Sequence, residues 1–109
     1  MSLDITLREV QSVKVFEGNI THNLNEMLSQ VGEIYYKAVW RPEELGLVHA
    51  WQLIQYLSGA VTELKRNPEA YKEFNPANGW GDYDNLVGFL EDYLEACHSH
   101  PTAYIHANR

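Results

Sequence analysis

The first part of the chain alternates between hydrophobic and polar residues. The hydrophobic positions are odd-numbered, at Leu3, Ile5, Leu7, Val13 and Val15. A two-residue period is typical of a β-strand with one buried face. Two interpretations fit: one long strand from Leu3 to Phe16 that Gly18 ends, or two short strands with a turn near Gln11–Ser12. The absence of glycine and proline from this stretch favours the single long strand.

A first helical region is predicted after this strand. Either Thr21 or Asn23 provides the N-cap, because short polar side chains satisfy the free amides of a first helical turn. Hydrophobic residues then recur at helical spacing, at Leu24, Met27, Leu28 and Val31. Gly32 ends this helix, or the periodicity continues to Trp40. The helix stops there at the latest, because the residue before Pro42 avoids the α region.

The middle of the chain predicts a short helical segment and a long helix. Pro42 opens the short segment, which ends at Gly46 and carries two glutamates at the positive end of its dipole. The long helix extends to about Lys65. Its expected buried face consists of Leu47, Trp51, Ile54, Leu57, Val61 and Leu64. This spacing places all six side chains on one side of a helix.

A short helix and a loop are expected next. Asn67 is predicted to cap a helix that begins at Pro68 and runs through Phe74. The following residues 75–81 contain a proline, two glycines and an Asn78–Gly79 turn dipeptide. Such a composition predicts a structured loop.

A last helix and a final strand complete the pattern. Asp82 is expected to cap a helix that runs to Cys97 and carries an acidic solvent face. Residues 103–107 alternate and predict an edge strand, which can pair with the N-terminal strand because chain termini often lie close together. The predicted fold is therefore α+β, with about four helices packed on a small antiparallel sheet made by the N- and C-terminal strands.

Length and composition indicate one folded domain. The chain has 109 residues, of which 45% are hydrophobic. We therefore expect residues 1–109 to form a single domain around one core. A domain of this size leaves much of its surface open to neighbours, so we also expect a homo-oligomer.

The net charge and the single cysteine limit the classes of partner and the cellular compartment that we expect. Fifteen acidic residues outnumber eight scattered basic ones, which gives a net charge of -7 and disfavours a nucleic-acid partner. No run of about 18 apolar residues occurs, so no membrane partner is expected. Cys97 cannot form an intramolecular disulfide, and residues 1–8 lack the basic and apolar segments of a signal peptide. The sequence therefore predicts a cytoplasmic protein.

The segment NPANGWGDY, residues 75–83, is the densest group of polar and aromatic residues. Glycines on both sides of Trp80 allow the backbone to approach a ligand closely. Trp80 and Tyr83 offer flat stacking surfaces, and Asn78 adds an amide. An alternative interpretation is a turn whose tryptophan fills the core and whose aspartate only caps a helix.

Two other segments supply candidate ligand-binding residues. Asn19 and His22 lie where the first strand becomes a helix, and capping explains neither of them. Arg41 beside Trp40 can hold a phosphate or carboxylate while the ring stacks on a base, or it forms a salt bridge with a neighbouring glutamate. The predicted ligand-binding set is Asn19, His22, Trp40, Arg41, Asn78, Trp80 and Tyr83.

The sequence predicts no catalytic residue, cofactor or metal. It lacks a nucleophile elbow, a phosphate loop and a dinucleotide fingerprint. Cys97, His98 and His100 make only a weak zinc pattern, because Cys97 belongs to the apolar face of the last helix. We therefore expect a binding protein rather than an enzyme.

Two segments resemble those of small uncharacterised proteins of bacteria and their phages. These are NITHN at residues 19–23 and the loop at 75–83, followed by a leucine-rich acidic helix that ends in Cys97 and a His-Pro step. That group has no assigned activity, so the resemblance carries over no catalytic residue. It implies a bacterial or phage setting, in which small proteins often act on host defence.

This setting leads to two hypotheses about function. In the first, the protein is a phage-related anti-defence protein that sequesters a small nucleotide-like ligand in a pocket of aromatic and polar residues. In the second, it is an acidic protein-interaction module that inhibits a host protein by occupying a basic groove. Neither hypothesis requires catalysis.

Overall fold

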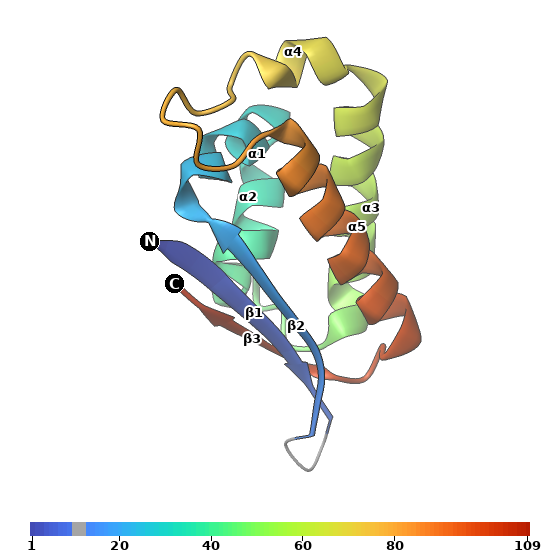
Figure 1. Ribbon diagram of the computed structural model, residues 1–109. Coiled ribbons are helices and arrows are strands. Elements are labelled where there is room, and N and C mark those ends of the chain that lie inside the picture. The colour runs from blue at the N-terminus through green and yellow to red at the C-terminus, as the bar shows by residue number, and fades with distance from the viewer. Residues whose placement is uncertain (10–12) are drawn as a thin grey trace.

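The computed structural model describes residues 1–9 and 13–109. It confirms the predicted α+β class, because helices pack on a three-stranded antiparallel sheet (Figure 1). The elements are β1 (Ser2–Arg8), β2 (Lys14–Thr21), the 3-10 helix η1 (His22–Leu24), α1 (Asn25–Val31), α2 (Glu33–Trp40), the 3-10 helix η2 (Pro42–Leu45), α3 (Ala50–Arg66), α4 (Pro68–Lys72), α5 (Tyr83–Ser99) and β3 (Tyr104–Asn108).

The prediction of one long N-terminal strand is wrong. β1 and β2 form an antiparallel pair in which Leu3 lies opposite Ile20, so the chain reverses direction between them. The alternative turn at Gln11–Ser12 lies outside the described residues. Gly18 does not end the strand, since it pairs with Ile5 and β2 continues beyond it. In this pairing, Ile20 and Phe16 of β2 lie opposite the buried Leu3 and Leu7 of β1, so they share the inner face of the sheet.

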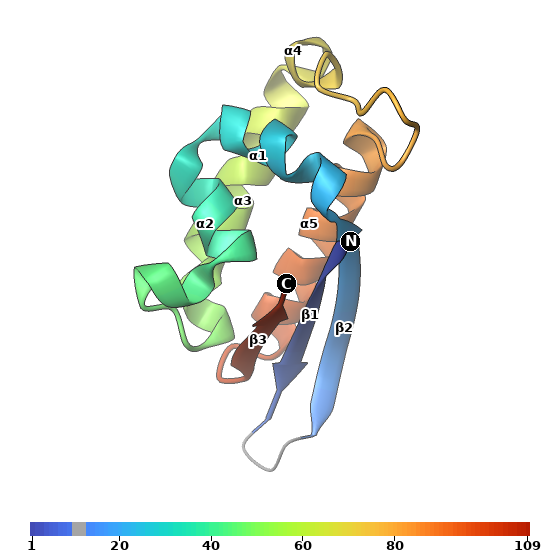
Figure 2. The same cartoon turned by 90° about the vertical axis from the view of Figure 1, so that its left-hand side faces the viewer.

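Helices cover only one face of the sheet, whose strand order is β2-β1-β3 (Figure 2). Leu3, Ile5 and Leu7 point into the core and are fully buried. Asp4 and Thr6 alternate with them, so they belong to the opposite, uncovered face. The sheet is therefore buried on one side only.

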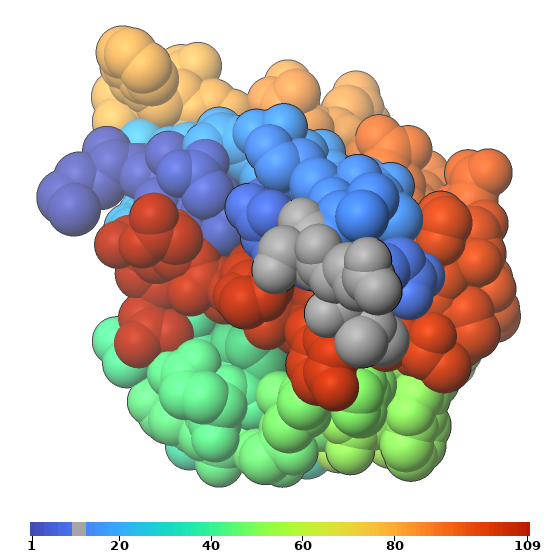
Figure 3. Space-filling model, turned by 90° about the horizontal axis from the view of Figure 1, so that it is seen from below, coloured from blue at the N-terminus to red at the C-terminus, as the bar shows by residue number. Residues whose placement is uncertain are grey.

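The predicted C-terminal edge strand is confirmed, and β3 pairs with β1. Seen from below, the red C-terminal residues lie between the blue hairpin and the green residues near the start of α3 (Figure 3). Backbone hydrogen bonds join the two segments: Ala50 N donates to Ala103 O at 2.9 Å, and Ile105 N donates to Val48 O at 2.9 Å. The outer edge of β3 is therefore partly paired.

Both readings of the region around Gly32 prove partly right. α1 ends at Val31, just before this glycine, and α2 then continues to Trp40. Of the two predicted N-caps, Thr21 is the one observed, and it caps η1 rather than α1: its Oγ1 accepts from Asn23 N at 3.3 Å. The predicted short segment ends as expected at Gly46, whose φ of 70° is left-handed.

The long helix differs from the prediction in its start and in its buried face. α3 begins at Ala50, three residues later than expected. Trp51 was predicted to be buried and is instead 56% exposed, while Ala50 and Leu53 are fully buried. The buried positions of α3 are Ala50, Leu53, Leu57, Ala60, Val61 and Leu64. They recur every three or four residues, so they form one stripe of the helix, and Trp51 lies beside that stripe.

The caps of the last two helices differ from each other. Asn67 does not cap α4, because its Nδ2 donates to the Glu63 carboxylate at 3.1 Å instead, and α4 ends at Lys72, short of Phe74. Asp82 caps α5 as predicted: its carboxylate accepts from Asn85 N at 2.8 Å. None of the described helices has both the length and the apolar composition to cross a bilayer.

Candidate functional site

The loop at 75–83 and the end of β2 meet at one pocket of about 480 Å3. Seven residues line it: Met1, Ser2, Asn19, Thr21, Asn23, Asn78 and Trp80. Asn19, Asn78 and Trp80 belong to the predicted ligand-binding set. The structure therefore brings together residues from two segments that are about sixty positions apart.

Gly81 allows the loop to reach the end of β2. It adopts a φ of +89°, which is unfavourable for residues with a side chain. A Cβ atom at this position would stand 2.9 Å from Leu24 Cδ1, closer than a normal contact. Position 81 therefore favours glycine for two reasons: the backbone has a positive φ, and a Cβ atom would be too close to Leu24.

The loop presents Trp80 outward. Asn78 Oδ1 accepts from Trp80 N at 2.9 Å, which closes a local turn, and Gly79 has a φ of +75°. The Trp80 side chain is 68% exposed. The alternative in which this tryptophan fills the core is therefore wrong, and its ring is free to stack on a ligand.

Hydrogen bonds orient the strand side of the pocket. Asn19 Nδ2 donates to Ser2 Oγ at 2.9 Å and to Asp4 Oδ1 at 2.6 Å, across the β1–β2 pair. Within the described part of the chain, Asn19 Oδ1 forms no hydrogen bond. Asn23 is exposed, and only its backbone is used in the turn. The amide groups on this side thus keep hydrogen-bonding capacity for a ligand.

The pocket lining is polar and uncharged at the side chains. It contains amides, hydroxyls, one thioether and one indole, and no lysine or arginine side chain of the described chain lines it. The carboxylate of the adjacent Asp4 accepts a hydrogen bond from Asn19. This chemistry suits an uncharged ligand that both donates and accepts hydrogen bonds.

The other four predicted residues lie elsewhere. Trp40 is 2% exposed and stacks on Tyr36, with ring centroids 5.8 Å apart. His22 packs edge-on against Trp40, with ring centroids 6.3 Å apart, and its buried Nε2 atom has no hydrogen-bond partner among residues 1–9 and 13–109. Trp40 therefore belongs to the hydrophobic core, His22 packs against it, and neither ring lines the pocket.

Arg41 forms the salt bridge that the sequence left as an alternative. Its Nε donates to Tyr36 Oη at 3.4 Å, and its Nη1 lies 3.2 Å from a Glu44 carboxylate oxygen. The hydrogen bond with Tyr36 and then the contact with Glu44 raise the pKa of Arg41. Arg41 is not among the residues that line the pocket.

The buried side chain of Tyr83 fixes the end of the 75–83 loop against the core. It is 7% exposed, and its hydroxyl donates to Leu64 O at 2.6 Å. Its backbone N donates to Asn75 Oδ1 at 2.8 Å, which ties the two ends of the loop together. Burial raises the pKa of Tyr83. Tyr83 therefore positions the segment that carries Trp80.

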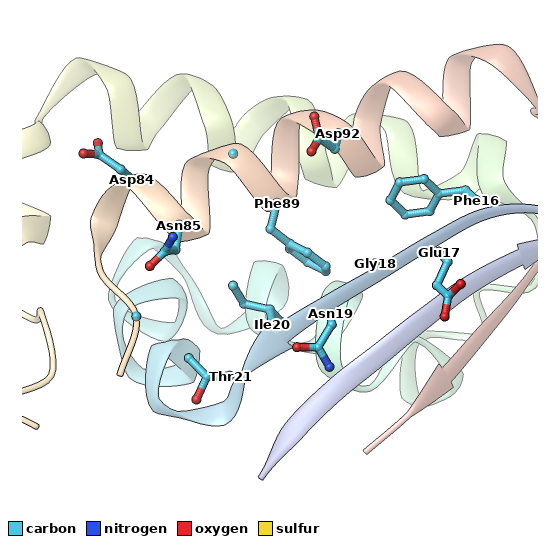
Figure 4. Close-up of a pocket in the computed structure, with 12 residues that line it drawn as sticks. Phe16, Glu17, Gly18, Asn19, Ile20, Thr21, Asp84, Asn85, Phe89 and Asp92 are labelled. Atoms are coloured by element: carbon cyan, nitrogen blue, oxygen red, sulfur yellow. The ribbon is translucent and has the colours of Figure 1, made fainter. Parts of the chain in front are cut away.

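A neighbouring groove of about 530 Å3 runs between β2 and α5 (Figure 4). Consecutive residues 16–21 of β2 line one side of it, and five residues of α5 line the other: Asp84, Asn85, Gly88, Phe89 and Asp92. Figure 4 shows Phe89 reaching from α5 toward β2. Sequence reasoning missed this groove because it depends on which helix lies beside which strand.

The structure does not gather a metal-binding cluster in residues 1–9 and 13–109. Cys97 is fully buried, and His100 Nδ1 lies 3.5 Å from a Glu9 carboxylate oxygen. Met1, Ser2, Thr21 and Asn23 also line the pocket but were not in the predicted set. Capping accounted for Thr21 and Asn23 in the sequence, and Ser2 reaches the site only through strand pairing.

No protein-family model, curated protein or solved structure significantly matches this chain. Arguments about function therefore rest on the geometry of the pocket and of the groove.

Proposed function

We propose that this protein is a non-enzymatic binding protein that holds a small, uncharged ring of the nucleobase or nucleoside type against Trp80. One observation carries the proposal: an exposed indole and the side chains of Asn19, Asn23 and Asn78 line a single pocket. The two segments that distinguished the sequence contribute all four of these residues.

The chemistry of the lining matches that of a base. Every nucleobase has a flat face, and stacking on an aromatic side chain contributes about 1–3 kcal/mol per base. Asparagine amides carry donors and an acceptor, and they pair with the edge of a base in known recognition modes. Because Asn19 is oriented by Ser2 and Asp4, part of this arrangement exists before a ligand arrives.

The same lining argues for recognition of the base rather than the phosphates. No lysine or arginine side chain of the described chain lies in the pocket, and Arg41 is paired with Glu44. A net charge of -7 also opposes a polyanionic ligand. In the phage setting that the resemblance implies, the protein would sequester a nucleotide signal by its base, with the phosphates directed toward solvent.

The fluorescence of Trp80 offers a direct test. Trp51 is exposed and lies outside the pocket, so Trp51→Phe removes its signal, whereas Trp40 is buried. In this background we expect saturable quenching on titration with one or more of adenosine, guanosine, cytidine and uridine. The matching 5′-monophosphates should bind no more tightly than the nucleosides.

Matched variants identify the site. By calorimetry, Trp80→Ala should weaken nucleoside binding by about 5- to 150-fold, the loss of one stacking contact. Trp51→Ala removes an exposed tryptophan outside the pocket and should leave the affinity unchanged. Equal affinities for the Trp80→Ala and Trp51→Ala variants, or saturable binding of glucose without binding of any nucleoside, would contradict the proposal.

A further inference from the structure

β2 is an outer strand of the sheet with an open edge. It pairs with β1 on one side, and no other strand of the described chain pairs with its second side. By contrast, the outer edge of β3 is partly occupied by the hydrogen bond from Ile105 N to Val48 O. An open edge has backbone donors and acceptors that an added strand can use.

The groove beside this edge has the shape that strand addition needs. Residues 16–21 of β2 line it along their whole length, and α5 forms the facing wall. Phe16, Ile20 and Phe89 supply apolar surface within it. An extended segment lying here would pair with β2 and place alternate side chains against α5.

Gly88 adds no side chain to the α5 side of the groove. It lies inside α5, where glycine weakens a helix relative to alanine. No packing contact explains its presence, because a Cβ atom at Gly88 would meet nothing within 4 Å. Gly18, by contrast, is explained by Phe89, whose ring would stand 3.1 Å from an added Cβ atom. An approaching partner accounts for the open space at Gly88.

The charged residues on the α5 side of the groove indicate which charge a partner should carry. Asp84 and Asp92 lie on the α5 side of the groove, and neither forms an ion pair within the part of the chain that the structure describes. No lysine or arginine is found among the described residues that line the groove. A second copy of this acidic chain would be repelled, whereas a basic segment would be attracted.

We infer that this groove binds an extended basic segment of another protein, which joins the sheet as a new strand beside β2. Asp84 and Asp92 are eight residues apart on one helix, which corresponds to about 12 Å. Side chains four residues apart on one face of a strand are separated by about 13 Å. The segment should therefore carry two lysines or arginines four residues apart, with the residue midway between them facing Gly88.

Synthetic peptides test this spacing. Two labelled peptides of identical composition carry two lysines, four residues apart in one and three apart in the other, among valines and threonines. In fluorescence anisotropy, the four-residue spacing should bind about two- to fivefold more tightly, because only it places both cations opposite carboxylates. N-methylation of alternate amides on the edge that pairs with β2 should weaken binding by a similar factor or more.

Variants of the groove provide the matched controls. A Cβ atom at Gly88 would meet nothing within 4 Å. Gly88→Leu therefore starts from an unobstructed position and adds bulk to the groove, so it should abolish peptide binding while the melting temperature is maintained or raised. Ser58→Leu adds the same side chain at an exposed position of α3 and should leave binding unchanged. Asp84→Asn with Asp92→Asn should weaken binding, whereas Glu33→Gln with Glu73→Gln, which removes two exposed charges outside the groove, should not.

Backbone amides report the mode of binding. Peptide addition should slow hydrogen exchange in β2 and shift its amide resonances together with those of α5. Equal affinity for the two spacings, full binding by the Gly88→Leu variant, or resonance shifts confined to other elements would each overturn the inference. Asn19 and Thr21 line both the groove and the nucleoside pocket. Gly88 lines the groove and not the pocket, and Trp80 lines the pocket and not the groove. The two proposals can therefore fail separately: Trp80→Ala should leave peptide binding intact, and Gly88→Leu should leave nucleoside binding intact.

Discussion

Gly81 and Thr21 are in such close contact that a Cβ atom on the glycine would stand 2.8 Å from Thr21 Cγ2. This contact joins the 75–83 loop to the end of β2, and the candidate pocket lies beside it. Both the proposed stacking residue and the asparagines of β2 and η1 depend on it for their relative position.

The loop contains a natural pair of positions for testing this contact. Gly79 and Gly81 both have a positive φ, but a Cβ atom at Gly79 would meet nothing within 4 Å. Gly79→Ala should therefore cost only backbone strain, about 1 kcal/mol of unfolding free energy. Gly81→Ala adds a steric clash and should cost about 2–4 kcal/mol, measured by urea unfolding. Equal losses in the two variants would contradict the role assigned to the contact.

Tyr83 should affect stability and not ligand affinity. Its hydroxyl donates to Leu64 O, which lacks the usual helical donor because the residue four positions later is Pro68. Tyr83→Phe leaves this buried carbonyl unpaired and should lower the unfolding free energy by about 1–2 kcal/mol. Nucleoside affinity, measured by calorimetry, should stay within error of the unmodified protein. A folded, equally stable variant with weakened affinity would instead place Tyr83 in the ligand site.

Glu63 should make stability depend on acid pH. Its carboxylate accepts hydrogen bonds from Tyr71 Oη at 2.9 Å and from Asn67 Nδ2 at 3.1 Å. The Tyr71 hydrogen bond and then the Asn67 hydrogen bond lower the pKa of Glu63. Because the folded state has the lower pKa, the stabilisation is present above the usual carboxylate value and is lost as the pH falls through the folded value.

Thermal unfolding of Glu63→Gln measures this linkage. At pH 7 the variant should melt below the unmodified protein, and the difference should shrink toward zero as the pH falls below about 4, the usual carboxylate range. Glu69→Gln serves as a control, because this exposed residue forms one ion pair with described residues, to Lys72 at 3.6 Å. A constant difference across the pH range would show that packing, and not ionisation, is what the substitution changes.

Cys97 should be protected from thiol reagents in the folded protein. It is fully buried, and burial raises its pKa to about 12. At pH 8 only about one thiol in ten thousand would be ionised, and the thiolate is the reactive form. Labelling with a chromogenic disulfide should therefore be slow in buffer and immediate in denaturant. Rapid labelling under native conditions would show that the C-terminal half of α5 opens readily.

Local signals in the sequence determined most of the secondary structure. The Asp82 cap, the end of the short segment at Gly46 and the helical periodicity of the last helix are all found in the structure. Each depends on residues within one or two turns of one another, so neighbouring side chains and backbone conformation decide it. The pairing of the terminal strands was also predicted: alternation indicated a strand at each end of the chain, and chain termini often lie close together.

The tertiary structure alone decided which residues meet. Trp51 has helical spacing with Ile54, which packs partly buried against the core, yet its indole is exposed because the buried stripe of α3 runs through Ala50, Leu53 and Leu57. Trp40 and Trp80 both looked suitable for stacking, and only packing distinguishes the buried ring from the exposed one. The pocket and the groove depend on contacts between distant segments, which are set by burial and strand register across the whole chain and leave no periodic signal in the sequence.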